Sequence, residues 1–115
     1  MSSGEMKQYL DQLATMMEEV KTVDPDFQAA WVALSTQGGK QGVLSVKTKE
    51  LICIAIGVVV HCDYCIASHV KKALQQGATR QEILEASFAA VKMGGGPAMA
   101  FLTRVIEACD EFGPH

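Results

Sequence analysis

The apolar side chains of this chain recur with a helical period along most of its length. Over residues 5–20 they lie three and four residues apart with acidic residues and lysines between them, which predicts an amphipathic helix. The apolar positions of this helix are Met6, Tyr9, Leu10, Leu13, Met16, Met17 and Val20. Since no stretch shows the clear alternation of a half-buried strand, we expect an all-α fold.

Turn and capping signals predict where the next two helices begin and end. Asp24 followed by Pro25 is a typical helix start, and Gly38–Gly39 ends the helix that follows. Ser45 caps a third helix, which is apolar nearly all round from Leu51 to Val60. Such a helix belongs in the middle of a bundle or in a subunit interface.

Three further signals shape the second half of the chain. The next helix ends at Gly77, and Thr79 to Glu82 form a capping box that starts another. The run Gly94–Pro97 ends that helix and opens the last one; it lacks the lysine and Ser/Thr of a phosphate-binding loop. The total is about six helices, and at 115 residues we expect one domain spanning 1–115.

Composition and charge indicate which partners and which cellular compartment to expect. A net charge of -3 gives no basic footprint, so we expect no nucleic-acid partner. The longest apolar run is far shorter than the roughly 20 residues that span a bilayer, and no secretory signal precedes it. We therefore expect a cytoplasmic protein without a membrane partner, in which four cysteines serve catalysis or metal binding more readily than a disulfide framework.

Chemistry-bearing residues gather around the end of the long apolar run. Cys62, Cys65 and His69 fall within an arc of about 60° on one helix face, so two sulfurs and an imidazole can converge there. His69 lies where a proton acceptor for the Cys65 thiol would have to lie. Glu50, at the head of the run, is either an exposed first-turn glutamate or a carboxylate that holds the histidine or relays its proton.

The cysteine pair favours redox chemistry. A thiol attacks as its thiolate, and with an ordinary pKa of about 8.5 it is little ionised at neutral pH without help. One ionised sulfur can attack a peroxide to give a sulfenic acid, which condenses with the second sulfur to form a disulfide, and an external thiol resets the pair. The helix start beside Cys62 would lower its pKa, which on helix physics alone makes Cys62 the nucleophile.

Neighbouring residues have weaker claims to a role. Tyr64 could supply a hydroxyl group to a proton relay, although aromatic packing is the simpler role, and His61 fits a solvent-facing position before the helix. Trp31 fits a core or interface anchor. Cys53 and Cys109 lie on helix faces predicted to be buried, where they would act as small apolar side chains.

Two other classes of function compete with the redox interpretation. Cys62, Cys65 and His69 could bind zinc with His61, Glu50 or water as fourth ligand, although a structural site normally closes with four firm N/S ligands. Alternatively, the chain is a non-enzymatic helical interaction module with incidental cysteines. We expect no metal and no cofactor beyond the dithiol itself.

The combined motifs resemble the carboxymuconolactone decarboxylase-like family, and specifically its AhpD-like alkylhydroperoxidase branch. They are Glu50, then Cys62-x-x-Cys65-x-x-x-His69, then Ala73-Leu74-x-x-Gly77-Ala78-Thr79-x-x-Glu82-Ile83 and a Gly-Gly-x-Pro helix start. The resemblance covers roughly residues 27 to 110. Relatives in the best-known branch also carry a histidine between the cysteines, where this chain has Asp63-Tyr64.

This resemblance implies an all-α fold in homo-oligomers, as trimers or hexamers, with a thiol peroxidase or disulfide oxidoreductase site. It implies that Cys65 attacks a hydroperoxide, that Cys62 resolves it, and that Glu50 and His69 relay protons. A lipoyl group or a thioredoxin-like protein would be the reductant. The ring-opening decarboxylase that names the family usually lacks the paired cysteines, so their presence argues against that activity.

Overall fold

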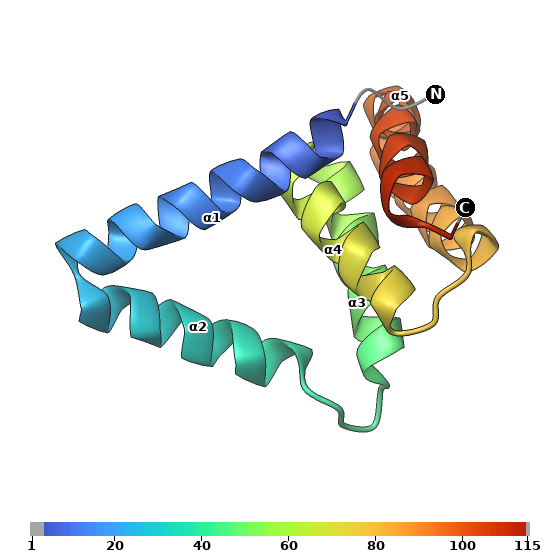
Figure 1. The fold of residues 1–115 in the computed structure, drawn as a ribbon. Coiled ribbons are helices and arrows are strands. Elements are labelled where there is room, and N and C mark those ends of the chain that lie inside the picture. The colour runs from blue at the N-terminus through green and yellow to red at the C-terminus, as the bar shows by residue number, and fades with distance from the viewer. Residues whose placement is uncertain (1–3, 115) are drawn as a thin grey trace.

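Five α-helices make up the described part of the chain, residues 4–114, in a computed structural model (Figure 1). They are α1 (Glu5–Val23), α2 (Pro25–Gly39), α3 (Val46–Val59), α4 (Asp63–Gln75) and α5 (Arg80–Phe112). No residue in this range belongs to a strand, so the predicted all-α fold is confirmed. None of these helices is long and apolar enough to span a membrane.

The predicted helix starts are confirmed by their capping hydrogen bonds. The Asp24 side chain accepts from the backbone N–H groups of Asp26 and Phe27, and Ser45 accepts from Thr48 N–H. Thr79 and Glu82 form the reciprocal capping box at the start of α5. These boundaries are set locally, by side chains within a few residues of each helix end.

The expected count of about six helices agrees with the structure, because α5 comprises two helices that meet at a kink without a loop between them. Gly95 leaves the helical conformation, at φ 71° and ψ -150°, so it ends the first of these helices, and the second runs on to Phe112. This backbone region is almost restricted to glycine. The kink therefore turns the second half of α5 back beside the first, so that Arg80 and Asp110, near its two ends, pair at 2.6 Å.

The core lies between α3, α4 and α5, which pack closely on one another. Its largest fully buried side chains include Ile54, Val58, Ile66, Val70, Ile83 and Val105, with Met6 from the start of α1. The helix α2 buries no residue, and with α1 it forms an arm projecting from the three core helices (Figure 1). Trp31 on α2 is 53% exposed, so it is not a core residue of the single chain.

Candidate redox site

The cysteine pair lies at the turn from α3 into α4. His61 adopts the left-handed conformation (φ 58°) that reverses the chain, and Cys62 becomes the N-cap of α4. Cys62 and Cys65 form a disulfide, with Cα atoms 5.2 Å apart. The Cys62 Sγ also accepts the Cys65 backbone N–H at 3.1 Å, as an N-cap side chain does. The oxidised pair thus lies at the start of α4.

A carboxylate and an imidazole meet on the neighbouring helix faces. Glu50 on α3 is only 9% exposed, and its Oε1 lies 2.6 Å from Nδ1 of His69 on α4. Glu50 is therefore not the exposed first-turn glutamate of the alternative interpretation. When the carboxylate accepts the Nδ1–H, the ring keeps Nε2 as its basic nitrogen.

A groove runs between the α1–α2 arm and the face of α4 that carries Cys65 and His69. One cavity, of about 410 Å³, is lined by both of these residues; a second, of about 640 Å³, is lined by Glu50 and His69. The two cavities share five lining residues: Trp31, Ser35, Thr36, His69 and Lys72. Cys62 lines neither cavity. The sulfur of the pair that borders this groove is thus that of Cys65.

Gly57 on α3 brings the two helices together at the cysteines, a role that the sequence did not reveal. Its carbonyl oxygen accepts the Cys62 N–H at 3.0 Å, and an added Cβ would lie 3.2 Å from the Cβ of Cys65. A side chain there would press directly on the disulfide. The signal in the sequence was a single glycine inside an otherwise apolar helix, which indicates close backbone approach.

Arg104 is a second residue near the site that sequence reasoning missed. Its guanidinium pairs with Glu5 at 3.1 Å, and its Nε lies 3.2 Å from the Oδ1 of Asp63, directly after Cys62. Tyr9 donates its hydroxyl to the same Glu5 oxygen; this hydrogen bond, together with burial, raises the pKa of Tyr9 to about 12. The network joins α1, α4 and α5 at the dithiol end of the bundle.

The two accessory candidates are engaged outside the Glu50–His69 pair. Tyr64 donates its hydroxyl to Gln12 at 2.8 Å and packs edge-on against Tyr9. Exposed His61 stacks on Phe101 with ring centroids 4.8 Å apart. The expected packing role of Tyr64 and the solvent-facing position of His61 both agree with this arrangement.

The two remaining cysteines differ from each other. Cys109 is buried as expected, and burial raises the pKa of its thiol to about 11. The expectation of a buried filler is wrong for Cys53, which is partly exposed and lines the same cavity as Glu50 and His69. Partial burial and the nearby Glu50 charge raise the pKa of its thiol.

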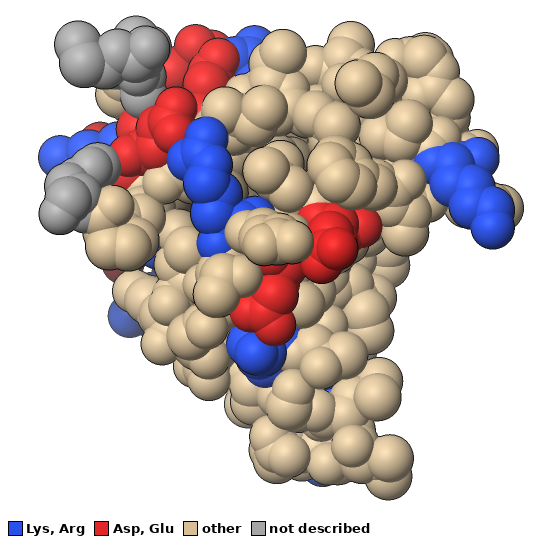
Figure 2. Space-filling model, turned by 90° about the vertical axis from the view of Figure 1, so that its right-hand side faces the viewer, with Lys and Arg blue, Asp and Glu red and all other residues tan. Residues whose placement is uncertain are grey.

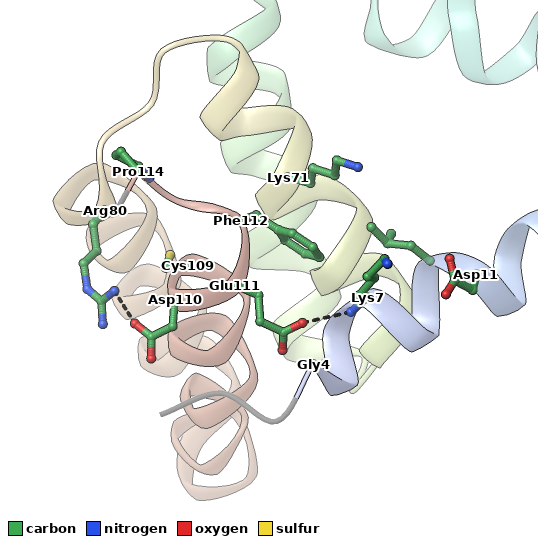
Figure 3. Close-up of a pocket in the computed structure, with 11 residues that line it drawn as sticks. Gly4, Lys7, Asp11, Lys71, Arg80, Cys109, Asp110, Glu111, Phe112 and Pro114 are labelled. Carbon is green, nitrogen blue, oxygen red and sulfur yellow. Dashed lines mark hydrogen bonds and ion pairs between the residues drawn. The ribbon is translucent and has the colours of Figure 1, made fainter.

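A third cavity, of about 850 Å³, lies away from the dithiol, where the described ends of the chain approach each other (Figure 3). Three of its charged side chains have partners within the chain: Arg80 pairs with Asp110 at 2.6 Å, and Glu111 accepts the Lys7 backbone N–H at 3.0 Å. Cys109 borders it, but the raised pKa keeps that thiol protonated at neutral pH. We place the functional site at the groove instead.

Metal ligation was the main alternative for the cysteine cluster. Within residues 4–114, no group of three or more His, Cys, Asp or Glu side chains is arranged to hold a metal ion. In the oxidised form, moreover, both sulfurs are bonded to each other.

Fold and site together define a small all-α protein with a disulfide-forming cysteine pair beside a buried Glu–His pair. The chain belongs to the carboxymuconolactone decarboxylase family, whose sequence profile matches residues 25–108. Its similarity to a protein of the cox locus of Paracoccus denitrificans reaches 39% identity over 82 residues, 71% of this chain and 74% of the relative.

Solved structures extend the likeness to nearly the full chain. A carboxymuconolactone decarboxylase family protein from Legionella pneumophila, crystallised in its apo form, superimposes with a TM-score of 0.93 at 32% identity, over 97% of this chain and 100% of the other. A second family member, from Thermotoga maritima, for which a part in the antioxidative response has been suggested, gives a TM-score of 0.80 at 29% identity, over 90% and 88%.

Proposed function

We propose that this protein is an AhpD-like thiol peroxidase that reduces hydroperoxides with the Cys62–Cys65 dithiol. The observation that carries the proposal is the placing of a disulfide-forming pair next to the buried Glu50–His69 hydrogen bond, on the wall of a groove. A buried carboxylate that orients an imidazole is a common arrangement for a general base. The suggested antioxidative part of the Thermotoga maritima relative supports the same chemistry.

In the proposed cycle, Cys65 attacks first because it shares the groove with His69. His69, oriented by Glu50, takes the thiol proton; the thiolate then bonds to one peroxide oxygen, the O–O bond breaks, and the alcohol leaves with a proton. Cys62 attacks the resulting sulfenic acid, which releases water and forms the disulfide. A dithiol reductant, such as a dihydrolipoyl group or a thioredoxin-like protein, returns the pair to two thiols and is itself oxidised.

The start of α4 favours Cys62, and not Cys65, as the attacking cysteine. The Cys62 sulfur accepts a backbone N–H and caps a helix, and both features stabilise a thiolate at Cys62. In our proposal that stabilisation serves the resolving step, since the attack on the sulfenic acid also requires a thiolate.

The test is hydroperoxide consumption with dihydrolipoamide as electron donor. We expect Cys65→Ser to abolish consumption, and Cys62→Ser to form a sulfenic acid that a dimedone probe traps but to stop turnover. If the two phenotypes are exchanged, Cys62 is the attacking residue and the roles must be reversed. If the wild type consumes no hydroperoxide with either a lipoyl or a thioredoxin-like donor, the peroxidase proposal is disproved.

We also propose that the protein is a homo-oligomer. Three apolar side chains on one face of α3 are between 39% and 56% exposed in the single chain: Ile52, Ile56 and Val59. On α5, Phe88 and Met99 are more than half exposed. Figure 2 shows the α5 side, where a broad area has no charged side chain. Apolar areas of this kind usually mark interaction surfaces.

A further inference from the structure

The groove beside Cys65 has one apolar half and one cationic half. Leu13, Met16 and Met17 of α1 and Trp31 and Val32 of α2 line the half nearest Cys65. The other half is bordered by Lys40, Lys49 and Lys72. The only acidic residue on either wall is Glu50, which is hydrogen-bonded to His69. This cationic half is notable in a chain whose net charge is -3.

Lys72 is the lysine best placed to meet a ligand. Lys40 and Lys49 use their ammonium groups within the chain: Lys40 donates to Gln37 and Lys49 to the Lys40 carbonyl oxygen, each at 2.6 Å. The ammonium group of Lys72 forms no ion pair or hydrogen bond with any residue of 4–114. Lys72 borders both cavities, at the junction between the apolar and the cationic half.

Spacing along α4 relates this charge to the reactive sulfur. Cys65, Ser68, His69 and Lys72 follow one another at helical intervals and all line the same cavity. Lys72 is seven residues beyond Cys65, which corresponds to about 10 Å along the helix axis. A ligand that reaches from one to the other is elongated. The apolar side chains of α1 and α2 in the same cavity favour an apolar chain, and the ammonium group of Lys72 favours a negative charge at its end.

From these features we propose that the groove binds long-chain carboxylates, with the carboxylate at Lys72 and the alkyl chain against the α1–α2 arm. The substrate that follows from this inference rests on the proposed peroxidase function. It is a fatty-acid hydroperoxide whose peroxide group lies at Cys65. The two cavities have the volumes typical of small-molecule sites. Lys72 is thus a specificity residue for the charged end of the substrate.

Binding can be measured without any turnover, because Trp31 is the single tryptophan of the chain and borders both cavities. Laurate, added to the full-length oxidised protein below its micelle concentration, should change Trp31 fluorescence saturably. Lys72→Met should weaken laurate binding about fivefold, the upper range for an exposed ion pair. Lys71→Met is the matched control. It removes the same charge from the adjacent position, which borders the cavity of Figure 3 and not the groove, and it should leave the affinity for laurate unchanged.

Methyl laurate separates charge recognition from simple apolar binding. Wild type should bind the ester about fivefold more weakly than the acid, and Lys72→Met should bind the two equally. With a fatty-acid hydroperoxide as substrate, Lys72→Met should raise KM and leave kcat nearly unchanged. Equal binding of acid and ester by the wild type, or an equal loss in Lys71→Met, would overturn the assignment of Lys72.

Absence of any saturable fluorescence change would overturn the groove proposal itself. Trp31 fluorescence that changes with protein concentration but not with laurate would show that a second copy of the chain covers the groove, and would also overturn it. These outcomes are independent of the peroxidase assay. Laurate binding without hydroperoxide consumption would refute the proposed function alone, whereas consumption without laurate binding would refute only this inference.

Discussion

The Glu50–His69 pair shows how far single residues could be interpreted from sequence. The helical spacing was enough to place Cys65 and His69 on one face of α4, because both lie within that helix, whereas Cys62 is its N-cap and does not border the groove. Whether Glu50 joined them depended on how α3 packs on α4, which residue spacing alone does not give. The structure answers this with a 2.6 Å contact between a buried carboxylate and the imidazole.

Removing either member of this pair should slow oxidation of the dithiol. We expect Glu50→Gln and His69→Ala each to reduce the rate of peroxide-driven oxidation about 10²-fold, the usual size for lost general-base assistance. Stopped-flow measurement of thiol loss in the reduced protein would provide the rates. Glu85→Gln, a neutralisation at an exposed position of α5, is the control and should have no effect. Unchanged rates in both site variants would remove the pair from the mechanism.

The four cysteines should separate by reactivity. Burial raises the pKa of Cys109 to about 11, and burial together with the Glu50 charge raises that of Cys53, so both thiols are almost fully protonated at pH 7. In the reduced native protein, iodoacetamide should therefore modify Cys62 and Cys65 well before the other two. Modification of Cys109 should accelerate as the pH rises toward 11, because its thiolate fraction increases there.

Peptide mass spectrometry after timed quenching would follow each thiol separately. In protein unfolded with guanidinium, all four cysteines should react at similar rates, which controls for intrinsic differences between the peptides. Rapid alkylation of Cys109 in the native protein at pH 7 would contradict the burial and the raised pKa.

At the scale of helices, the sequence predicted where the helices begin, but it did not predict which of their faces are exposed to solvent. Asp24, Ser45 and Thr79 cap their helices through hydrogen bonds to residues two or three positions away, so the sequence contains the whole signal. Trp31 of α2, in contrast, was expected to be a core or interface anchor, and no residue of α2 is buried in the single chain. What covers a helix depends on tertiary and quaternary contacts, which its own periodicity does not encode.

The kink in α5 gives a prediction at this scale. Gly95→Ala should lower the free energy of unfolding by about 1–3 kcal/mol, because a Cβ is strained at φ 71° and ψ -150°. Urea denaturation followed by circular dichroism would measure the loss. Gly38→Ala is the control, since Gly38 lies in a helix with open space around its Cα and should be neutral or slightly stabilising. Equal effects in the two variants would show that the kink is not maintained by Gly95.

For the whole molecule, the sequence predicted an all-α domain, and its apolar third helix indicated a bundle centre or an interface. In the structure, one side of α3 lies in the bundle core and the other side is exposed. Ile54 and Val58 point into the core and are fully buried, whereas Ile52, Ile56 and Val59 are on the surface of the single chain. A helix that is apolar on both sides has one side left over after the chain has folded, and this is the side that we expect a second subunit to cover.

Oligomerisation should therefore depend on this face of α3. Multi-angle light scattering of the wild type should give a mass that is a multiple of the 12.4 kDa chain. A double variant, Ile52→Glu with Ile56→Glu, should shift the mass toward a single chain, because charged side chains are costly to desolvate in an apolar interface. Val43→Glu, at a fully exposed position in the α2–α3 connection, should leave the mass unchanged. A wild-type mass of one chain over the whole concentration range would show that these residues face solvent, and the exposed face would then need another partner.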